Sequence, residues 1–135
     1  MDQDNYPAPL DDVERRAIEC LLTGPELWKV GLRSQLVGCQ AASRSRNIYG
    51  PTTYLLPSSN APAEEGLPPA FPLECVVRHP SLSHSGNFAL WTDAGKLHML
   101  EAMSHGDEQW PSHDEPELFQ FEALPLFVRR SNADA

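Results

Sequence analysis

The amino-acid sequence predicts an α+β fold, in which an N-terminal helical hairpin packs on an antiparallel sheet of five to six strands. Apolar residues recur at helical spacing as far as Leu36, whereas after Gly38 they alternate with a period of two. The strand-like runs follow one another without intervening helices, which is typical of an antiparallel sheet. At 135 residues, 41% of them hydrophobic, we expect residues 1–135 to form a single domain with one core.

The first helix has clear boundary signals. Asp11 is expected to cap it, and Glu14 stands where a capping box places an acidic side chain. Gly24 is expected to end it. Its predicted core face comprises Val13, Ala17, Ile18, Leu21 and Leu22. The residues expected on its outer face are Glu14, Arg15 and Glu19.

A second helix is predicted to restart directly, with Pro25 in its first turn, where the missing N–H costs little. Gly38 is expected to close it. Its predicted apolar stripe comprises Leu27, Trp28, Gly31, Leu32 and Leu36.

The strands are predicted over residues 39–44, 52–56, 73–78, 88–92 and 96–103, with a sixth from 118 or 119 to 122. Asp93-Ala94-Gly95 separates two alternating runs and indicates a tight hairpin, because glycine adopts the positive φ that such turns need. Tyr54 and Leu56 are expected on one face of their strand. Residues 57–70 contain four prolines and are expected to form an exposed loop, and residues 125–135 a flexible tail.

The chain is acidic, with 19 acidic against 10 basic residues and a net charge of −9. Nucleic acid and anionic membrane are therefore not expected as partners, since both are bound through cationic side chains. A basic protein is the expected partner, although acidity also serves solubility alone. The N-terminus has no basic, apolar leader and the three cysteines form no CxxC pair, so we expect a cytoplasmic protein with reduced thiols.

Charge is distributed unevenly along the chain. Residues 97–128 contain seven acids and no lysine or arginine. Acidic side chains around an exposed aromatic favour protein recognition, because charge steers the encounter and the aromatic anchors it. The alternative is that Trp110 folds back on the sheet as part of the core. The expected partner-binding residues are Asp107, Glu108, Trp110, Asp114, Glu115 and Glu117.

No catalytic residue, metal site or cofactor is predicted. Strict alternation would put His98 and Glu101 on opposite faces of a strand, where they cannot share a metal ion unless a bulge intervenes. The histidines and acids of residues 105–115 lack a known ligand spacing and are interpreted as solvated turn residues. His79 and His84 flank serines, but no nucleophile elbow or acidic orienter accompanies them.

The order of motifs resembles a family of small bacterial proteins, most of them uncharacterised. The matching segments are Leu21–Gly24, Leu32–Leu36, Ser43–Arg44, His84–Leu90, Asp93–Glu101 and Trp110–Pro111. This chain departs from the family pattern in the Asp-Ala-Gly turn, at Asn87 and after Leu124. The resemblance implies no established enzymatic activity, and the family is similar in character to the immunity proteins of bacterial toxin systems.

The expected function is accordingly that of a non-enzymatic immunity protein, which neutralises a toxin domain by direct binding. Two alternatives stay open. One is an enzyme or small-ligand protein with a pocket near His84, Trp91 and His98, and the other is a structural interaction subunit. The sequence leaves the oligomeric state unknown.

Overall fold

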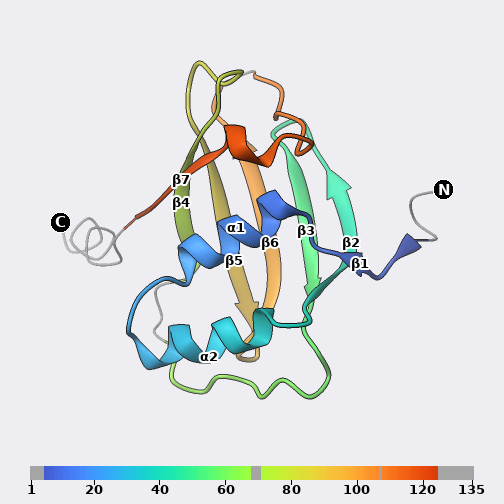
Figure 1. The fold of residues 1–135 in the computed structure, drawn as a ribbon, viewed down its shortest axis with the longest axis vertical. Helices are drawn as coiled ribbons and strands as arrows, with labels where there is room; N and C mark the ends of the chain where they lie inside the picture. The colour runs from blue at the N-terminus through green and yellow to red at the C-terminus, as the bar shows by residue number, and fades with distance from the viewer. Residues whose placement is uncertain (1–4, 68–70, 107, 125–135) are drawn as a thin grey trace.

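The structure is a computed structural model that describes residues 5–67, 71–106 and 108–124. Within them, two helices lie on one face of a seven-stranded antiparallel sheet (Figure 1). The helices are α1 (Asp12–Leu21) and α2 (Leu27–Leu36). The strands are β1 (Ala8–Pro9), β2 (Gln40–Arg46), β3 (Pro51–Leu56), β4 (Leu73–Arg78), β5 (Gly86–Asp93), β6 (Lys96–Ser104) and β7 (Gln120–Ala123).

The α+β class and the N-terminal helices are as predicted, but the count of five to six strands is wrong. The additional strand is β1, which pairs with β2 through Ala8 and Pro9 at the edge of the sheet. Two residues are too short for an alternating pattern, and proline is tolerated in an edge strand because its missing N–H is not needed there. The strand order is β1-β2-β3-β6-β5-β4-β7.

The hairpin between β5 and β6 forms at the predicted turn. Ala94 and Gly95 have φ values of 50° and 78°, as both central residues of a type I′ turn require. Gly95 also lies close against the backbone of the proline-rich loop, since a Cβ at this position would be 2.4 Å from the carbonyl oxygen of Glu64. The Asp-Ala-Gly sequence therefore predicted the turn. The close contact with the loop is a second reason why position 95 requires glycine.

The capping box of α1 is confirmed, but its end and the start of α2 were predicted incorrectly. The helix ends at Leu21 with Leu22 as its C-cap, and Gly24 lies in the connection with φ of 141°. Pro25 precedes Glu26, the N-cap of α2, and is therefore outside the helix. The guanidinium of Arg33 donates to the carbonyls of Leu22 and Gly24, so α2 itself satisfies the C-terminal end of α1.

The core face of α2 differs from the predicted stripe. Leu27 is 84% exposed, whereas Leu32 and Leu36 are buried. The polar side chain of Gln35 is fully buried as well. Its Oε1 accepts from the N–H of Leu97 at 2.8 Å, and its Nε2 donates to the carbonyls of Gly95 at 2.9 Å and Pro62 at 3.0 Å. Gln35 thus fastens both the β5–β6 turn and the proline-rich loop to the helix layer.

The predicted exposed loop is described as far as residue 67, and residues 68–70 lie outside the description, as do residues 125–135 with the expected tail. Most of the described loop is exposed or half-buried, as expected. Leu67 packs against the core, and the N–H of Glu64 donates to Gly95 O at 2.8 Å. The loop is therefore attached to the fold at several points.

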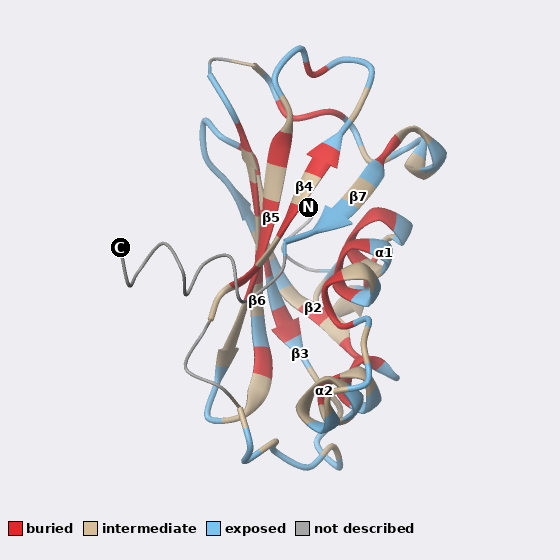
Figure 2. Ribbon diagram, turned by 90° about the vertical axis from the view of Figure 1, so that its left-hand side faces the viewer, coloured by how far each residue is buried: buried red, intermediate tan, exposed pale blue. Residues whose placement is uncertain are grey.

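The helices cover only one face of the sheet, and the opposite face is left open by the described elements (Figure 2). A β-bulge at His98 breaks the alternation on β6, because Trp91 pairs with Met99 while Thr92 pairs with Leu97. The extra residue lets Leu97 and Leu100 both reach the core.

The prediction that His98 and Glu101 face opposite ways is therefore wrong. His98 contacts the ring of Tyr54, which is exposed on the open face, and Glu101 accepts a hydrogen bond from Trp91 on that same face.

Candidate functional site

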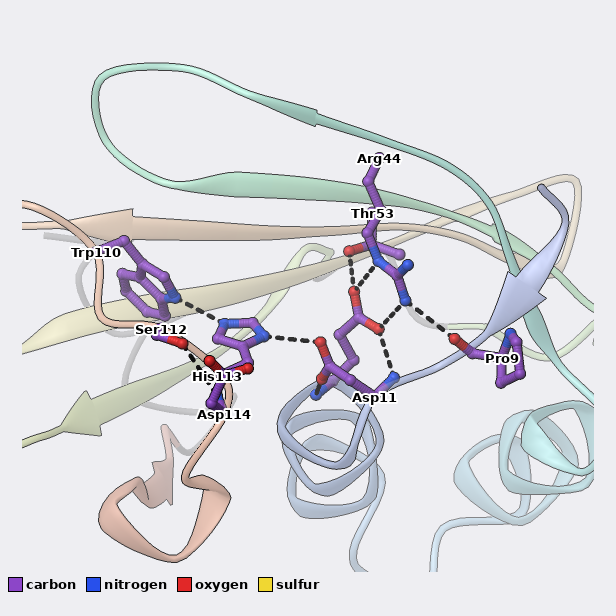
Figure 3. Close-up of polar contacts among 9 residues, drawn as sticks. Pro9, Asp11, Arg44, Thr53, Trp110, Ser112, His113 and Asp114 are labelled. Carbon is purple, nitrogen blue, oxygen red and sulfur yellow. Dashed lines mark hydrogen bonds and ion pairs between the residues drawn. The ribbon is translucent and has the colours of Figure 1, made fainter. Parts of the chain in front are cut away.

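Three chain segments meet in a polar network at the N-terminal end of α1 (Figure 3). Its centre is Glu14, which is 2% exposed although the helix pattern placed it on the outer face. The guanidinium of Arg44 on β2 binds this carboxylate with both Nε, at 2.9 Å, and Nη2, at 2.7 Å. Thr53 on β3 donates at 2.5 Å, and the N–H of Asp11 donates at 2.8 Å. The buried charge is thus fully hydrogen-bonded, which makes its burial tolerable.

Arg44 is correspondingly fixed. Its hydrogen bonds with the Glu14 carboxylate raise the pKa of Arg44 against the opposing effect of burial, and its Nη2 also donates to Pro9 O at 3.1 Å. The strand prediction placed Arg44 at a strand end without a partner. Its partner is 30 residues away in the sequence, and no local spacing relates the two.

The same helix end binds the segment after β6. The Asp11 Oδ2 atom lies 2.9 Å from Nδ1 of His113, and Nε2 of His113 accepts a hydrogen bond of 2.8 Å from Nε1 of Trp110. Indole N–H is only a donor, so Nε2 must be the unprotonated nitrogen and Nδ1 must carry the proton that Asp11 accepts. The hydrogen bond from Trp110 therefore sets the tautomer of His113.

The Asp11 carboxylate has several stabilising neighbours. Burial alone would raise the pKa of Asp11, but the hydrogen bonds from His113 and from the N–H of Glu14, with the nearby charge of Arg44, lower it overall. Asp11 is thus ionised across the neutral pH range, and it acts both as helix cap and as acceptor for His113.

An Asp–His pair of this kind orients the general base in many hydrolases. Here the nitrogen that would accept a proton from a nucleophile is already occupied by the Trp110 N–H. A cleft of about 390 Å³ lies alongside, lined by Asp11, Arg44, Arg46 and residues 109–113. Within the described residues, the hydrogen bonds of His113 involve no serine or cysteine. The geometry therefore favours a role for His113 in holding the chain segment in place.

Trp110 lies in the core, as in the alternative that the sequence left open. It is 3% exposed and packs edge-on against Phe88, with the ring centroids 5.3 Å apart. Gly86 makes room for it, because a Cβ at this position would be 2.8 Å from the indole ring. The expectation that Trp110 is an exposed anchor for a partner is therefore corrected.

Residues 108–119, which we call the acidic connection, contain the other described candidates. The carboxylate of Glu108 accepts from the N–H of Ser83 at 2.7 Å, from its hydroxyl at 2.5 Å and from the N–H of His84 at 2.8 Å. These hydrogen bonds, with the nearby His84, lower the pKa of Glu108 to about 2. Glu108 thus holds the β4–β5 loop against the acidic connection.

Asp114, Glu115 and Glu117 are exposed, and Asp107 lies outside the described residues. No side-chain hydrogen bond or ion pair engages these three carboxylates among the described residues. They remain available at the surface for an interaction with another molecule.

The structure does not bring together His84, Trp91 and His98, the residues named for the alternative pocket. His84 lies just before β5, which begins at Gly86. Trp91 is five residues beyond Gly86 on this strand, so the two positions are roughly 17 Å apart at the rise of an extended strand. His84 is exposed beside Glu108, whereas the indole of Trp91 donates to Glu101 at 2.7 Å on the open face.

The serine near His79 has a local explanation. The Ser81 hydroxyl lies 3.0 Å from His79 Nδ1, which also accepts the backbone N–H of Ser81 at 3.0 Å. Partial burial lowers the pKa of His79. Because both bonds lie within one three-residue turn, the contact serves the turn, and no carboxylate hydrogen-bonds His79 in the described part of the chain.

No protein-family model matches the chain, and no curated protein and no solved structure is significantly similar to it. The family resemblance drawn from the motifs therefore stays a prediction. In the described ranges, no group of three or more His, Cys, Asp and Glu side chains is arranged to hold a metal ion. Neither described helix has the length and hydrophobicity that crossing a membrane requires.

Proposed function

We propose that this chain is a non-enzymatic binding protein whose acidic connection recognises a basic protein partner. We further propose that the partner is a bacterial toxin domain, that binding neutralises it, and that the protein acts in the cytoplasm. The observation that carries the proposal is the presentation of Asp114, Glu115 and Glu117, all exposed, between Trp110 and Phe119, which are buried in the core.

The acidic connection is held at successive points along its length. Trp110 and Phe119 are buried at its two ends, and His113 is bound to Asp11 between them. Further along, Arg16 of α1 donates to Pro116 O at 2.8 Å. A loop ordered before binding loses little conformational entropy when a partner docks, so more of the interaction energy appears as affinity.

The charge of the molecule supports the same partner chemistry. The net charge is −9, and residues 97–128 contain no lysine or arginine. A surface of this sign accelerates the encounter with a basic protein and disfavours phosphate backbones. A cytoplasmic location agrees with the three free cysteines, and burial raises the pKa of Cys75 to about 12, which keeps its thiol protonated.

The proposal is tested by comparing three baits in lysate of the native host. These are the wild-type chain, a variant with Asp114, Glu115 and Glu117 changed to lysine, and a control with Glu19, Glu65 and Asp93 changed to lysine. All six positions are exposed and the two variants have the same net charge. We expect wild type and control to retain a basic partner that the first variant loses.

The toxin assignment is tested separately. The captured protein is expressed alone and together with each bait chain, and we expect growth arrest that the wild type relieves and the acidic-connection variant does not. Equal capture by all three baits would contradict the binding site. A captured protein without toxicity would contradict the immunity role while leaving the binding role in place.

A further inference from the structure

The turn between β2 and β3 exposes two large apolar side chains. Ile48 is 83% exposed and Tyr49 is 49% exposed. A single exposed apolar residue is ordinary on a protein surface, and Leu27 on α2 is equally exposed at 84%. The difference between these positions lies in what surrounds them.

The turn that carries Ile48 is tightly organised. The Asn47 side-chain oxygen accepts from the N–H groups of Tyr49 at 2.7 Å and Gly50 at 3.2 Å, and the N–H of Asn47 donates to Gly50 O at 3.1 Å. Gly50 lies against β6, where a Cβ would be 2.7 Å from Ala102 O. The backbone that presents Ile48 is therefore fixed by local bonds and by the neighbouring strand.

The turn is also joined to the acidic connection. The N–H of Ser104 donates to Tyr49 O at 2.9 Å, and the Ser104 hydroxyl donates to Glu108 O at 2.6 Å. The β2–β3 turn and the segment after β6 lie at the same end of the sheet (Figure 1). One shallow cleft of about 310 Å³ is lined by Ile48, Glu108 and Gln109, and also by the basic residue Arg46. An exposed aliphatic side chain and the start of the acidic connection thus share one surface.

We propose that Ile48 and Tyr49 are the apolar anchors of the partner-binding surface. They take the role that the sequence analysis expected for Trp110. The partner that fits this surface is a protein domain with an apolar depression bordered by lysine or arginine side chains. The depression takes Ile48 and Tyr49, and the basic border meets the carboxylates of the acidic connection. This inference rests on the proposed function, which it deepens by naming the anchors.

Binding interfaces concentrate their affinity in a few central apolar or aromatic side chains surrounded by polar groups. Ile48 and Tyr49 match that arrangement because they project from an ordered turn next to charged residues. Leu27 provides a matched comparison, because it is equally exposed but belongs to α2, which lies away from the acidic connection (Figure 1).

The test uses the full chain with the photo-crosslinking residue p-benzoyl-L-phenylalanine at position 48, or at position 27 as control, expressed in the native host. We expect one discrete crosslinked protein from position 48 and none from position 27. Mass spectrometry of the product is expected to place the crosslink in a lysine- or arginine-rich surface of a folded domain. Absence of a product at position 48, equal products at both positions, or a crosslink in an acidic surface would overturn the inference.

Affinity for the crosslinked protein, purified, is then measured for Ile48→Asp, Tyr49→Ala and Leu27→Asp. We expect Ile48→Asp to weaken binding by roughly thirtyfold, the loss typical of a central interface residue, and Leu27→Asp by less than about twofold. Unchanged circular dichroism melting is the folding check. Normal binding by Ile48→Asp, together with loss of binding when Asp114, Glu115 and Glu117 are reversed, would refute the role of Ile48 as an anchor. The proposed function of the acidic connection would be supported by the same result.

Discussion

Nε1 of Trp110 donates a hydrogen bond of 2.8 Å to Nε2 of His113, and this bond joins a buried indole to the cap of α1. It determines the tautomer of His113 and removes that nitrogen from proton transfer. The pair therefore positions the acidic connection against the helix layer, and its loss should be visible in stability.

His113→Ala should lower the free energy of unfolding by about 1–3 kcal/mol, because the buried N–H of Trp110 loses the acceptor that it has among the described residues. The measurement is urea denaturation followed by far-UV circular dichroism. His105→Ala is the matched control, since His105 is exposed in the same part of the chain. Equal effects of the two substitutions would show that the Trp110–His113 bond contributes nothing measurable.

Arg44→Ala should cost about 3 kcal/mol, because it leaves the buried carboxylate of Glu14 without its counter-charge. This is the lower end of the range for such a loss, since the Arg44 side chain is itself 27% exposed. Chemical denaturation of the purified variant gives the value.

The control is Arg78→Ala. Arg78 pairs with Glu122, and both side chains are more than half exposed, at 58% and 64%. Removing that pair should cost no more than about 1 kcal/mol. A similar cost for both arginines would mean that Glu14 finds other compensation when Arg44 is absent.

Glu108 should make stability depend on pH in the acid range. Hydrogen bonds from Ser83 and His84 lower its pKa from the ordinary 4.5 to about 2 in the folded chain. A lowered pKa means that the stabilisation is fully present above pH 4.5 and is lost as the pH falls towards 2.

The direct measurement is the NMR titration of the Glu108 carboxyl carbon, with an expected midpoint near 2. Glu108→Gln should in addition flatten the fall in unfolding free energy between about pH 4.5 and 2. A carboxyl midpoint close to 4.5 would contradict the hydrogen-bonded role of Glu108.

Gln35→Leu should destabilise the hairpin end of the sheet. The substitution keeps the bulk of the side chain but removes the hydrogen bonds of the Gln35 amide with the buried N–H of Leu97 and the carbonyl of Pro62. Each of these groups that stays unsatisfied should lower the free energy of unfolding by about 1–3 kcal/mol. Hydrogen exchange of the Leu97 amide should accelerate, and Ser34→Ala, at an exposed neighbouring position, should leave it unchanged. Unaltered protection of Leu97 in Gln35→Leu would refute this role.

Much of the fold followed from interactions between residues close in sequence. The capping box joins Asp11 and Glu14 within one helical turn, and Ala94 with Gly95 closes a hairpin between adjacent strands. The alternation of Tyr54 and Leu55 gave the two faces of β3 correctly. Such features depend on neighbours in the chain or on a repeating pattern, so a single sequence contains the information for them.

The errors arose where a distant residue changes the local preference. Glu14 has the sequence position of a surface residue, yet Arg44 and Thr53 bring it into the interior by satisfying its charge. The bulge at His98 has no signal in the alternating pattern, because the register of β6 is set by its pairing with β5. Ala8 and Pro9 form a strand only because β2 is there to pair with them.

The sequence by itself determined the acidic character of this protein, the N-terminal cap of its first helix and its hairpin turn. The tertiary structure alone decided which side chains of the acidic connection and of the β2–β3 turn are exposed. Glu108 is bound to Ser83 and His84, Trp110 fills the space above Gly86, and Ile48 projects from a turn that Asn47 and Ser104 hold. The physical reason is that charge is a property of each residue, whereas exposure depends on which distant segments pack or bond together.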